Sequence, residues 1–187
     1  MASTDGTRGR PVFAGLTVYR DLKHRFSLLY PEGWAHAPAP KAAGGGVVFS
    51  LAADEPHSFL LVQARRLPSK AQPDDLDALR GGLLEGVQQL PEAHVLEENA
   101  RVTGPLLDAE ARHTFRDAGS GTVRQRWVRL LCQDRTQISL VAQGATQERF
   151  AYWLPMFTTV MRTVQFADWW AEATGQSWRK ELTDPVD

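Results

Sequence analysis

The chain has 187 residues, of which 43% are hydrophobic and 23% are charged, and this balance excludes a mainly disordered or fibrous protein. The 21 basic and 22 acidic residues nearly cancel, so net charge favours neither nucleic acid nor an anionic membrane as partner. No apolar run approaches the roughly 20 residues that span a bilayer, and no apolar stretch follows the charges at the start of the chain. Together with a single cysteine, Cys132, these features predict a soluble cytoplasmic protein.

We expect three parts along the chain: a flexible arm over residues 1–12, one domain over 13–166 and a helical extension over 167–187. The arm is rich in Gly, Ser, Thr and Arg, which bury too little surface to offset the entropy lost on ordering. The extension carries three tryptophans among charged residues, which is typical of a short helix with a frayed end. The single domain is therefore expected to carry the function.

Short apolar segments in the first part of the domain predict β-strands. They lie at 16–19, 26–30, 47–51 and 58–67. The segment 35–46 is rich in Ala, Pro and Gly and is expected to be a loop. Trp34 follows the turn Pro31-Glu32-Gly33, and we expect its side chain to plug the core near that turn.

The periodicity then changes, and leucine and valine recur every three or four residues between Pro73 and Leu90. This spacing predicts a first helix with Pro73 in its first turn. Gly81, Gly82 and Gly86 each lower the helix propensity by up to about 1 kcal/mol relative to alanine. The helix must therefore be held by packing on a sheet.

Four longer strands and a second helix complete the domain. The strands are predicted at 95–103, 106–117, 122–133 and 137–144, joined in an antiparallel meander. The helix is predicted at 146–164, and Pro155 is expected to kink or restart it. The predicted fold class is α+β, a single antiparallel sheet of about seven strands flanked by helices.

The turn at 118–121 sets the register of the two strands that it joins. It places Asp117 opposite Thr122, and the same register brings Ala109 opposite Leu130 on an apolar face. The next hairpin is expected to close over 134–136. Ile138, Leu140 and Ala142 would then lie beside Cys132, Leu130 and Val128 on that apolar face, because a shift by one residue would move them to the polar face.

The opposite face of these strands carries polar and aromatic side chains, and we expect it to point outward, away from the helices. Arg112 lies opposite Trp127 on this face. Arginine and tryptophan commonly anchor protein interfaces, so the face is a candidate recognition surface; the alternative is an ordinary solvated sheet face. The candidate partner-binding residues are Arg112, Gln125, Trp127, Arg129 and Gln143.

No recognised catalytic or cofactor motif is present in the sequence. The five histidines lack zinc-ligand spacing, Gly44-Gly45-Gly46 is not followed by the GK[ST] of a phosphate loop, and Ser120 falls in a hairpin turn. Cys132 is expected to be a small buried hydrophobe. We therefore expect no cofactor, no metal and no enzymatic activity.

A small hydrolase is the catalytic alternative, since residues distant in sequence can still assemble a site. It would require a strongly perturbed histidine near a nucleophile, and His113 is the candidate. His113 falls on the apolar face, so it needs a hydrogen-bond partner or a place at the sheet margin.

Several segments together resemble a known family. Tyr19-Arg20-Asp21 and the run FSLLYPEGW at 26–34 resemble the opening of PsbP-like domains. The acidic start of the first helix, the step Leu90-Pro91, the VRQRWV strand at 123–128 and the aromatic second helix continue the pattern. The resemblance covers about residues 16–166.

The resemblance implies binding rather than catalysis. PsbP-like domains serve as photosystem II extrinsic subunits, Ran-binding regulators, bacterial lipoproteins and effector-associated chaperones of type VI secretion, and fold does not choose among them. The chain is most similar in pattern to the cytoplasmic secretion chaperones. In that family an exposed sheet face holds hydrophobic effector segments, which would map to the surface around Trp127.

The function implied is a non-enzymatic protein-binding module, a secretion chaperone or adaptor whose partner is a hydrophobic segment of a secreted effector. An accessory subunit of a larger assembly is the alternative from the same resemblance. A second copy of the chain is a further candidate partner, in a homodimer. We expect neither nucleic acid nor a membrane among the partners.

Overall fold

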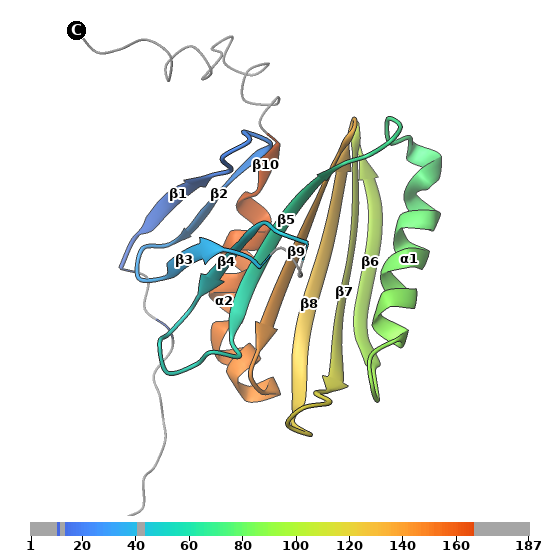
Figure 1. Cartoon of the computed structure of the whole chain (residues 1–187). Helices are drawn as coiled ribbons and strands as arrows, with labels where there is room; N and C mark the ends of the chain where they lie inside the picture. The colour runs from blue at the N-terminus through green and yellow to red at the C-terminus, as the bar shows by residue number, and fades with distance from the viewer. Residues whose placement is uncertain (1–10, 12–13, 41–43, 167–187) are drawn as a thin grey trace, which may run out of the picture.

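The computed structural model describes residues 11, 14–40 and 44–166, and it contains two antiparallel sheets and two α-helices (Figure 1). The predicted arm, apart from Pro11, and the predicted extension at 167–187 lie outside the described residues. The α+β class with a seven-stranded antiparallel sheet is confirmed.

The larger sheet has the strand order β3-β4-β5-β9-β8-β7-β6, and every neighbouring pair in it is antiparallel. Its strands are β3 (Ala35–Pro38), β4 (Val47–Ser50), β5 (Phe59–Arg66), β6 (His94–Thr103), β7 (Leu106–Arg116), β8 (Val123–Gln133) and β9 (Thr136–Gly144). Strand β3 lies in a segment that was expected to be a loop. Its four residues are all exposed, so it carries none of the apolar alternation that marks a strand.

A second sheet of three strands was not anticipated. It consists of β1 (Leu16–Arg20), β2 (Phe26–Pro31) and β10 (Gln165–Phe166), in the order β1-β2-β10. The two residues of β10 pair antiparallel with the start of β2, where Phe166 lies opposite Phe26. The first two predicted strands therefore form and pair with each other, but outside the larger sheet.

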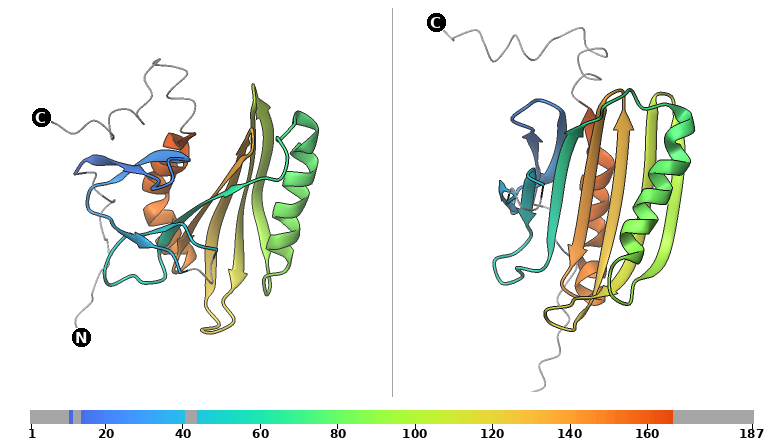
Figure 2. Two further views of the ribbon diagram at one scale, coloured as in Figure 1. Left: turned by 45° about the horizontal axis from the view of Figure 1, so that its top comes forward. Right: turned by 45° about the vertical axis from the view of Figure 1, so that its right-hand side comes forward.

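The two helices cover opposite faces of the larger sheet (Figures 1 and 2). Helix α1 (Leu76–Gln88), preceded by the 3-10 turn Pro73–Asp75, packs on β6 and β7. Helix α2 (Gln147–Thr163) packs on β8 and β9 and also on β2, so it lies between the two sheets.

Helix α1 is held by packing against small side chains, as its glycines required. Leu83 and Val87 are buried, and Leu83 joins Ala109 and Ala111 of β7 in one apolar cluster. Alanines on the strand let the helix approach closely. Pro73 begins the first turn, where the backbone N–H of Gln72 donates to Asp75 Oδ2 at 2.8 Å.

Helix α2 supplies most of the larger core. Its N-cap is Thr146, whose hydroxyl oxygen accepts from the Arg149 N–H at 3.1 Å. Phe150, Phe157 and Val160 are fully buried against the sheets. The helix neither stops nor restarts at Pro155, which corrects one of the two expected outcomes for that residue.

Trp34 plugs the core as predicted. Its side chain is 5% exposed and meets Trp153 and Phe157 of α2 edge-on, with ring centroids 6.2 Å apart in both pairs. Edge-to-face contacts of this kind suit the charge distribution of aromatic rings. The turn before β3 is therefore anchored to α2.

The register of β7 and β8 is as predicted, with Ala109 opposite Leu130 and Arg112 opposite Trp127. The register predicted for β8 and β9 is wrong by one residue. The turn contains two residues, Asp134 and Arg135, and Gln133 pairs with Thr136. Asp134 adopts a left-handed conformation, with φ 50°, which aspartate tolerates better than most residues.

The corrected register moves Ile138, Leu140 and Ala142 onto the face of Leu131, Arg129 and Trp127. All three remain fully buried, because α2 covers that face. The expectation that one face is core and the other solvated was therefore wrong. Each face of the sheet has its own helix.

The glycines of α1 provide a test of how the helix is held. A Cβ added at Gly82 would have no atom within 4 Å, and the residue is exposed. Gly82→Ala should raise the free energy of unfolding by about 0.5–1 kcal/mol in urea titrations, because alanine loses less backbone entropy. Gly46→Ala is the contrasting variant. At Gly46, φ is 102° and the new Cβ would lie 2.2 Å from the Val62 carbonyl oxygen, so that change should destabilise the protein.

Candidate functional site

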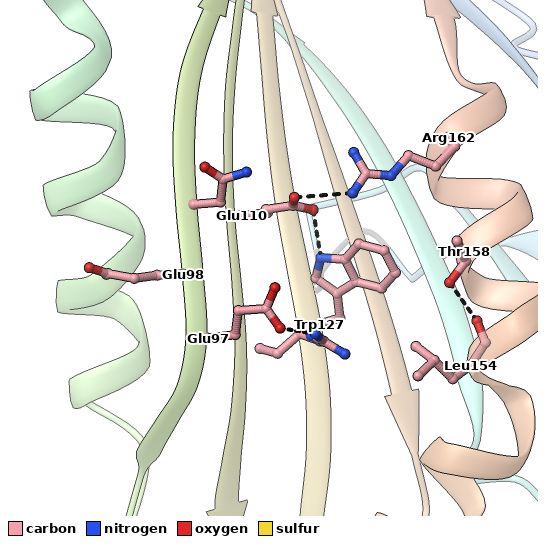
Figure 3. Close-up of a pocket in the computed structure, with 9 residues that line it drawn as sticks. Glu97, Glu98, Glu110, Trp127, Leu154, Thr158 and Arg162 are labelled. Atoms are coloured by element: carbon pink, nitrogen blue, oxygen red, sulfur yellow. Dashed lines mark hydrogen bonds and ion pairs between the residues drawn. The ribbon is translucent and has the colours of Figure 1, made fainter.

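A groove opens where α2 leaves part of its sheet face uncovered (Figure 3). It has a volume of about 180 Å³ and lies between α2 and strands β6, β7 and β8. Its lining residues are Glu97, Glu98, Asn99, Glu110, Arg112, Trp127, Leu154, Thr158 and Arg162. We call it the Trp127 groove.

Trp127 forms the floor of the groove and is held in place by polar contacts. Its indole Nε1–H donates to Glu110 Oε2 at 3.1 Å, across from β8 to β7. The other oxygen of Glu110 accepts from Arg162 Nη2 of α2 at 3.3 Å. The Arg162 guanidinium lies 5.9 Å from the Trp127 ring centroid, within the range of a cation–π contact. One carboxylate thus fixes the tryptophan and ties the helix to the sheet (Figure 3).

The outer wall of the groove is charged and more exposed. Arg112 of β7 forms an ion pair with Glu97 of β6. The Glu97 side chain is 59% exposed, so this pair contributes little to stability and can rearrange at low cost. Glu98 points away from the groove toward α1, where it pairs with Arg80 (Figure 3).

A buried ion pair lies on the same face of β7 and β8 as the groove. Arg129 donates from Nε and Nη2 to the two oxygens of Asp108, both at 2.8 Å, and its Nη1 donates to the Met161 carbonyl near the end of α2. Arg101 adds two bonds to the same carboxylate, at 2.8 and 3.1 Å. The side chains of Arg129 and Asp108 are 8% and 3% exposed, so both charges depend on each other.

The ionisation of Asp108 reflects this arrangement. Burial opposes the charged form of the carboxyl group, but hydrogen bonds and charge from Arg129, and secondarily from Arg101, outweigh burial. The pKa of Asp108 is therefore lower than usual, and its carboxyl group stays charged at neutral pH.

The five predicted partner-binding residues do not form one exposed surface. Arg112 and Trp127 line the groove, and Gln125 and Arg129 lie on the same face of β8. Gln143 lies on the opposite face, because the register of β9 differs by one residue from that expected. Trp127, Arg129 and Gln143 are buried, since α2 covers one face and local contacts fill the other. Whether any of the five binds a partner stays a prediction.

The sequence reasoning missed the contribution of α2 to the groove. Leu154, Thr158 and Arg162 recur every four residues and so form one stripe along the helix. That stripe lies beside the buried face and could have been recognised by its spacing. Its position over Trp127 depends on how the helix crosses the sheet, which no local pattern encodes.

His113, the histidine that the hydrolase alternative would require, is buried on β7. It is 1% exposed, and neither ring nitrogen has a hydrogen-bond partner among the described residues, contrary to the expectation of a partner or a marginal position. Burial, with a smaller contribution from the charge of Arg126, lowers its pKa to about 4. Among all the residues that the structure describes, no three His, Cys, Asp or Glu side chains gather where they could hold a metal ion.

Cys132 is a buried thiol, as predicted. Burial raises its pKa to about 11, so the thiol is protonated at neutral pH.

Among the residues that the structure describes, no helix is long and apolar enough to cross a membrane.

Replacing Asp108 tests the buried pair. Asp108→Asn keeps the size of the side chain but leaves the Arg129 charge uncompensated, so the free energy of unfolding should fall by about 3–5 kcal/mol. Because the folded-state pKa of Asp108 is lowered, its contribution is present above about pH 4 and is lost as the pH falls through the folded pKa. The difference between wild type and variant in urea titrations should therefore shrink in acid. Glu92→Gln, at the exposed pair with Arg116, is the control and should leave the midpoint nearly unchanged.

The lowered pKa of His113 predicts a second pH dependence of stability, which can be separated from that of Asp108. Because its pKa is lowered from 6.5 to about 4 in the folded state, the unfolded chain binds more protons between these values. Stability should fall as the pH drops from about 6.5 toward 4, by at most about 1.4 kcal/mol per pH unit. His113→Leu should flatten this slope. His94→Leu, at an exposed histidine, is the matched control, and an equal flattening in it would contradict the assignment.

Comparison with known proteins gives likeness at the level of structure. Neither the family models nor the curated proteins that were compared match the chain. Among solved structures, CyanoP, the cyanobacterial PsbP of Synechocystis sp. PCC 6803, is similar with a TM-score of 0.59 and 20% identity, over 86% of this chain and 99% of CyanoP.

Two further solved structures are similar. LpqN of Mycobacterium tuberculosis, involved in cell envelope biogenesis, has a TM-score of 0.59 and 14% identity, over 81% of this chain and 90% of LpqN. The Ran-binding protein Mog1p of Saccharomyces cerevisiae has a TM-score of 0.50 and 11% identity, over 82% of this chain and 96% of Mog1p. At these identities the likeness is one of fold, and the chain has a PsbP-like fold.

Proposed function

We propose that the chain is a non-enzymatic protein-binding module that takes up an extended protein segment along β6, beside the Trp127 groove. One observation carries this proposal: β6 is a ten-residue strand at the edge of the larger sheet, and the groove lies directly beside it. A strand at a sheet edge presents backbone N–H and C=O groups that another strand can pair with.

The side chains of β6 suit selective pairing. Leu96 and Val102 are 49% and 40% exposed, which leaves two apolar contacts open on the strand. Glu97 and Glu98 lie between them, and charged residues on an edge disfavour indiscriminate strand addition. A partner strand must therefore offer apolar groups and tolerate or complement these carboxylates.

The size of the groove favours side chains of a protein over a small-molecule ligand. Its volume of about 180 Å³ is below the roughly 300–1,000 Å³ of typical ligand pockets. One or two partner side chains could enter it and contact the Trp127 indole, while the exposed Arg112–Glu97 pair rearranges at the rim. Mog1p, which shares the fold, is a Ran-binding protein, so this fold can serve protein recognition.

The finer form of the proposal is a secretion chaperone or adaptor in the cytoplasm. Its partner would be a hydrophobic segment of a secreted effector, with apolar residues placed to meet Leu96 and Val102. The support for this form is the pair of exposed apolar side chains on the edge strand together with the sequence resemblance described above.

Two matched double variants test the edge. Leu96→Lys with Val102→Lys adds charge to exposed positions of β6, and Leu16→Lys with Val18→Lys does the same at similarly exposed positions of edge strand β1. Tagged proteins would be purified from the native host, and bound proteins quantified by mass spectrometry. We expect the amount of specific partner recovered with the β6 variant to fall at least tenfold, because strand pairing and apolar contact are both removed. The β1 variant should recover as much partner as wild type.

Three outcomes would contradict the proposal. Retention of the partner by the β6 variant, or its loss only from the β1 variant, would exclude β6 as the binding edge. A concentration-dependent dimer that only the β6 changes disrupt, measured by sedimentation, would show that a second copy occupies the edge. Trp127→Ala is unsuitable here, since removing a buried tryptophan costs about 3–5 kcal/mol and confounds binding with folding.

A further inference from the structure

A second, larger cavity lies at one end of the molecule, and its lining is strongly basic. It has a volume of about 460 Å³ and is lined by residues of the β1–β2 turn, the end of β5, the β8–β9 turn and β10. These segments lie toward the upper end of Figure 1. Five cationic side chains line it, against one acidic side chain, Asp134. The five are Lys23, Arg25, Arg65, Arg66 and Arg135. We call it the basic cavity.

This concentration of positive charge is not a consequence of composition. The whole chain has 21 basic and 22 acidic residues, so a cavity with five cations and one anion reflects segregation. Asp134 is itself neutralised by Lys70, whose Nζ lies 2.7 Å from its Oδ1. When Lys70 and Asp21, the partner of Arg25, are included, six cations still face two anions.

Most arginines outside the cavity are paired with carboxylates. Eight of the ten described arginines outside the cavity form ion pairs with carboxylates, most of them across strands or between a helix and a sheet. Arg65, Arg66, Arg135 and Lys23 form no ion pair with any described carboxylate. Arg65 donates to the Gln137 side chain and Arg135 to the Pro68 carbonyl, so neutral groups orient two of the guanidinium groups and leave their charges uncompensated.

One wall of the cavity is rigidly built. Arg25 donates from Nε and Nη2 to the two oxygens of Asp21, at 2.7 and 2.9 Å, and its Nη1 donates to the Ala64 carbonyl of β5. Asp21 is 7% exposed, and the Arg25 bonds, which outweigh the effect of burial, hold its pKa below the usual value. Arg25 therefore clamps the β1–β2 turn to the larger sheet, and Lys23 in that turn is held near Arg65 and Arg66 around the same cavity.

We propose that the basic cavity binds a small molecule that carries two or more oxyanion groups, phosphate or carboxylate. Guanidinium groups match the planar and tetrahedral oxygens of both by paired hydrogen bonds, and several uncompensated cations around one cavity favour a ligand of multiple negative charge. The volume falls within the range of small-molecule sites, unlike that of the Trp127 groove. This binding is independent of the protein-binding role proposed for β6.

The test uses the full chain with two probes, tripolyphosphate and citrate, titrated by isothermal calorimetry at about 50 mM salt, where screening is weak. We expect one-site binding of at least one probe, weakened at higher salt. Lys23→Gln with Arg66→Gln should weaken it at least tenfold. Both residues are exposed, so the variant should remain folded, which thermal unfolding would verify. Preference for tripolyphosphate or for citrate would identify the oxyanion group.

The matched control is Arg80→Gln with Arg116→Gln, which changes the net charge equally. Arg80 lies on α1, and Arg116 lies opposite Val123, at the end of β8 away from the β8–β9 turn. This variant should bind the probe as tightly as wild type. The proposal is overturned if neither probe binds, if the cavity variant binds as tightly as wild type, or if both variants weaken binding equally, since net charge alone would then explain it.

Discussion

The position of α2 between two sheets is the constraint on which the rest of this structure depends. The helix buries Phe157, Val160 and Met161 completely, and its neighbours include β2 on one side and β8 and β9 on the other. Burial at about 25 cal/mol per Å² makes such a contact the dominant favourable contribution to folding. The N-terminal end of the helix approaches the sheet so closely that a Cβ at Gly144 would lie 2.4 Å from the Phe150 nitrogen. The helix therefore needs glycine at the end of β9.

Polar contacts then fix what hydrophobic burial leaves open, which is how far α2 slides along the sheet. Arg129, held by Asp108, reaches the Met161 carbonyl, and Arg162 reaches Glu110. At the other end of the helix, Trp153 donates from Nε1 to Glu55 Oε2 at 3.1 Å. These contacts are directional, whereas apolar packing is not, so they set the position of α2 relative to Trp127. The groove owes its shape to them.

Much of the fold could be predicted from local pattern, and the errors arise where the answer depends on tertiary contacts. The β7–β8 register followed from a turn whose residues are visible in sequence, and Asp117 does pair with Thr122 through a backbone hydrogen bond of 2.9 Å. The prediction of the β8–β9 register failed because a helix covers each face of the sheet. Ile138 and Leu140 are therefore buried in either register. Hydrophobic alternation specifies a register only when one face of the sheet is exposed to solvent.

The candidate site was harder to predict for the same reason. Arg112 and Trp127 were identified from their cross-strand pairing, but the expectation of an exposed face assumed that both helices share one side of the sheet. Nothing in the spacing of α1 or α2 says which face either will cover. The three-stranded sheet was also hidden, since β10 is only two residues long and its partner β2 lies almost the whole domain away in sequence.

The two surfaces proposed for binding differ in how their charges are arranged, and this difference separates their chemistry. Around the Trp127 groove each cation has a carboxylate: Arg112 has Glu97, and Arg162 has Glu110. Such a surface has little net electrostatic field, so it discriminates between partners by shape and by hydrogen bonds, as protein interfaces do. Around the basic cavity only Arg25 has a carboxylate partner, Asp21, and the other four cations have none, so a net positive field attracts anions before any contact forms. A chain with almost no net charge can therefore hold both surfaces, because it pairs the arginines around the groove with acidic residues and leaves most cations around the cavity without such a partner.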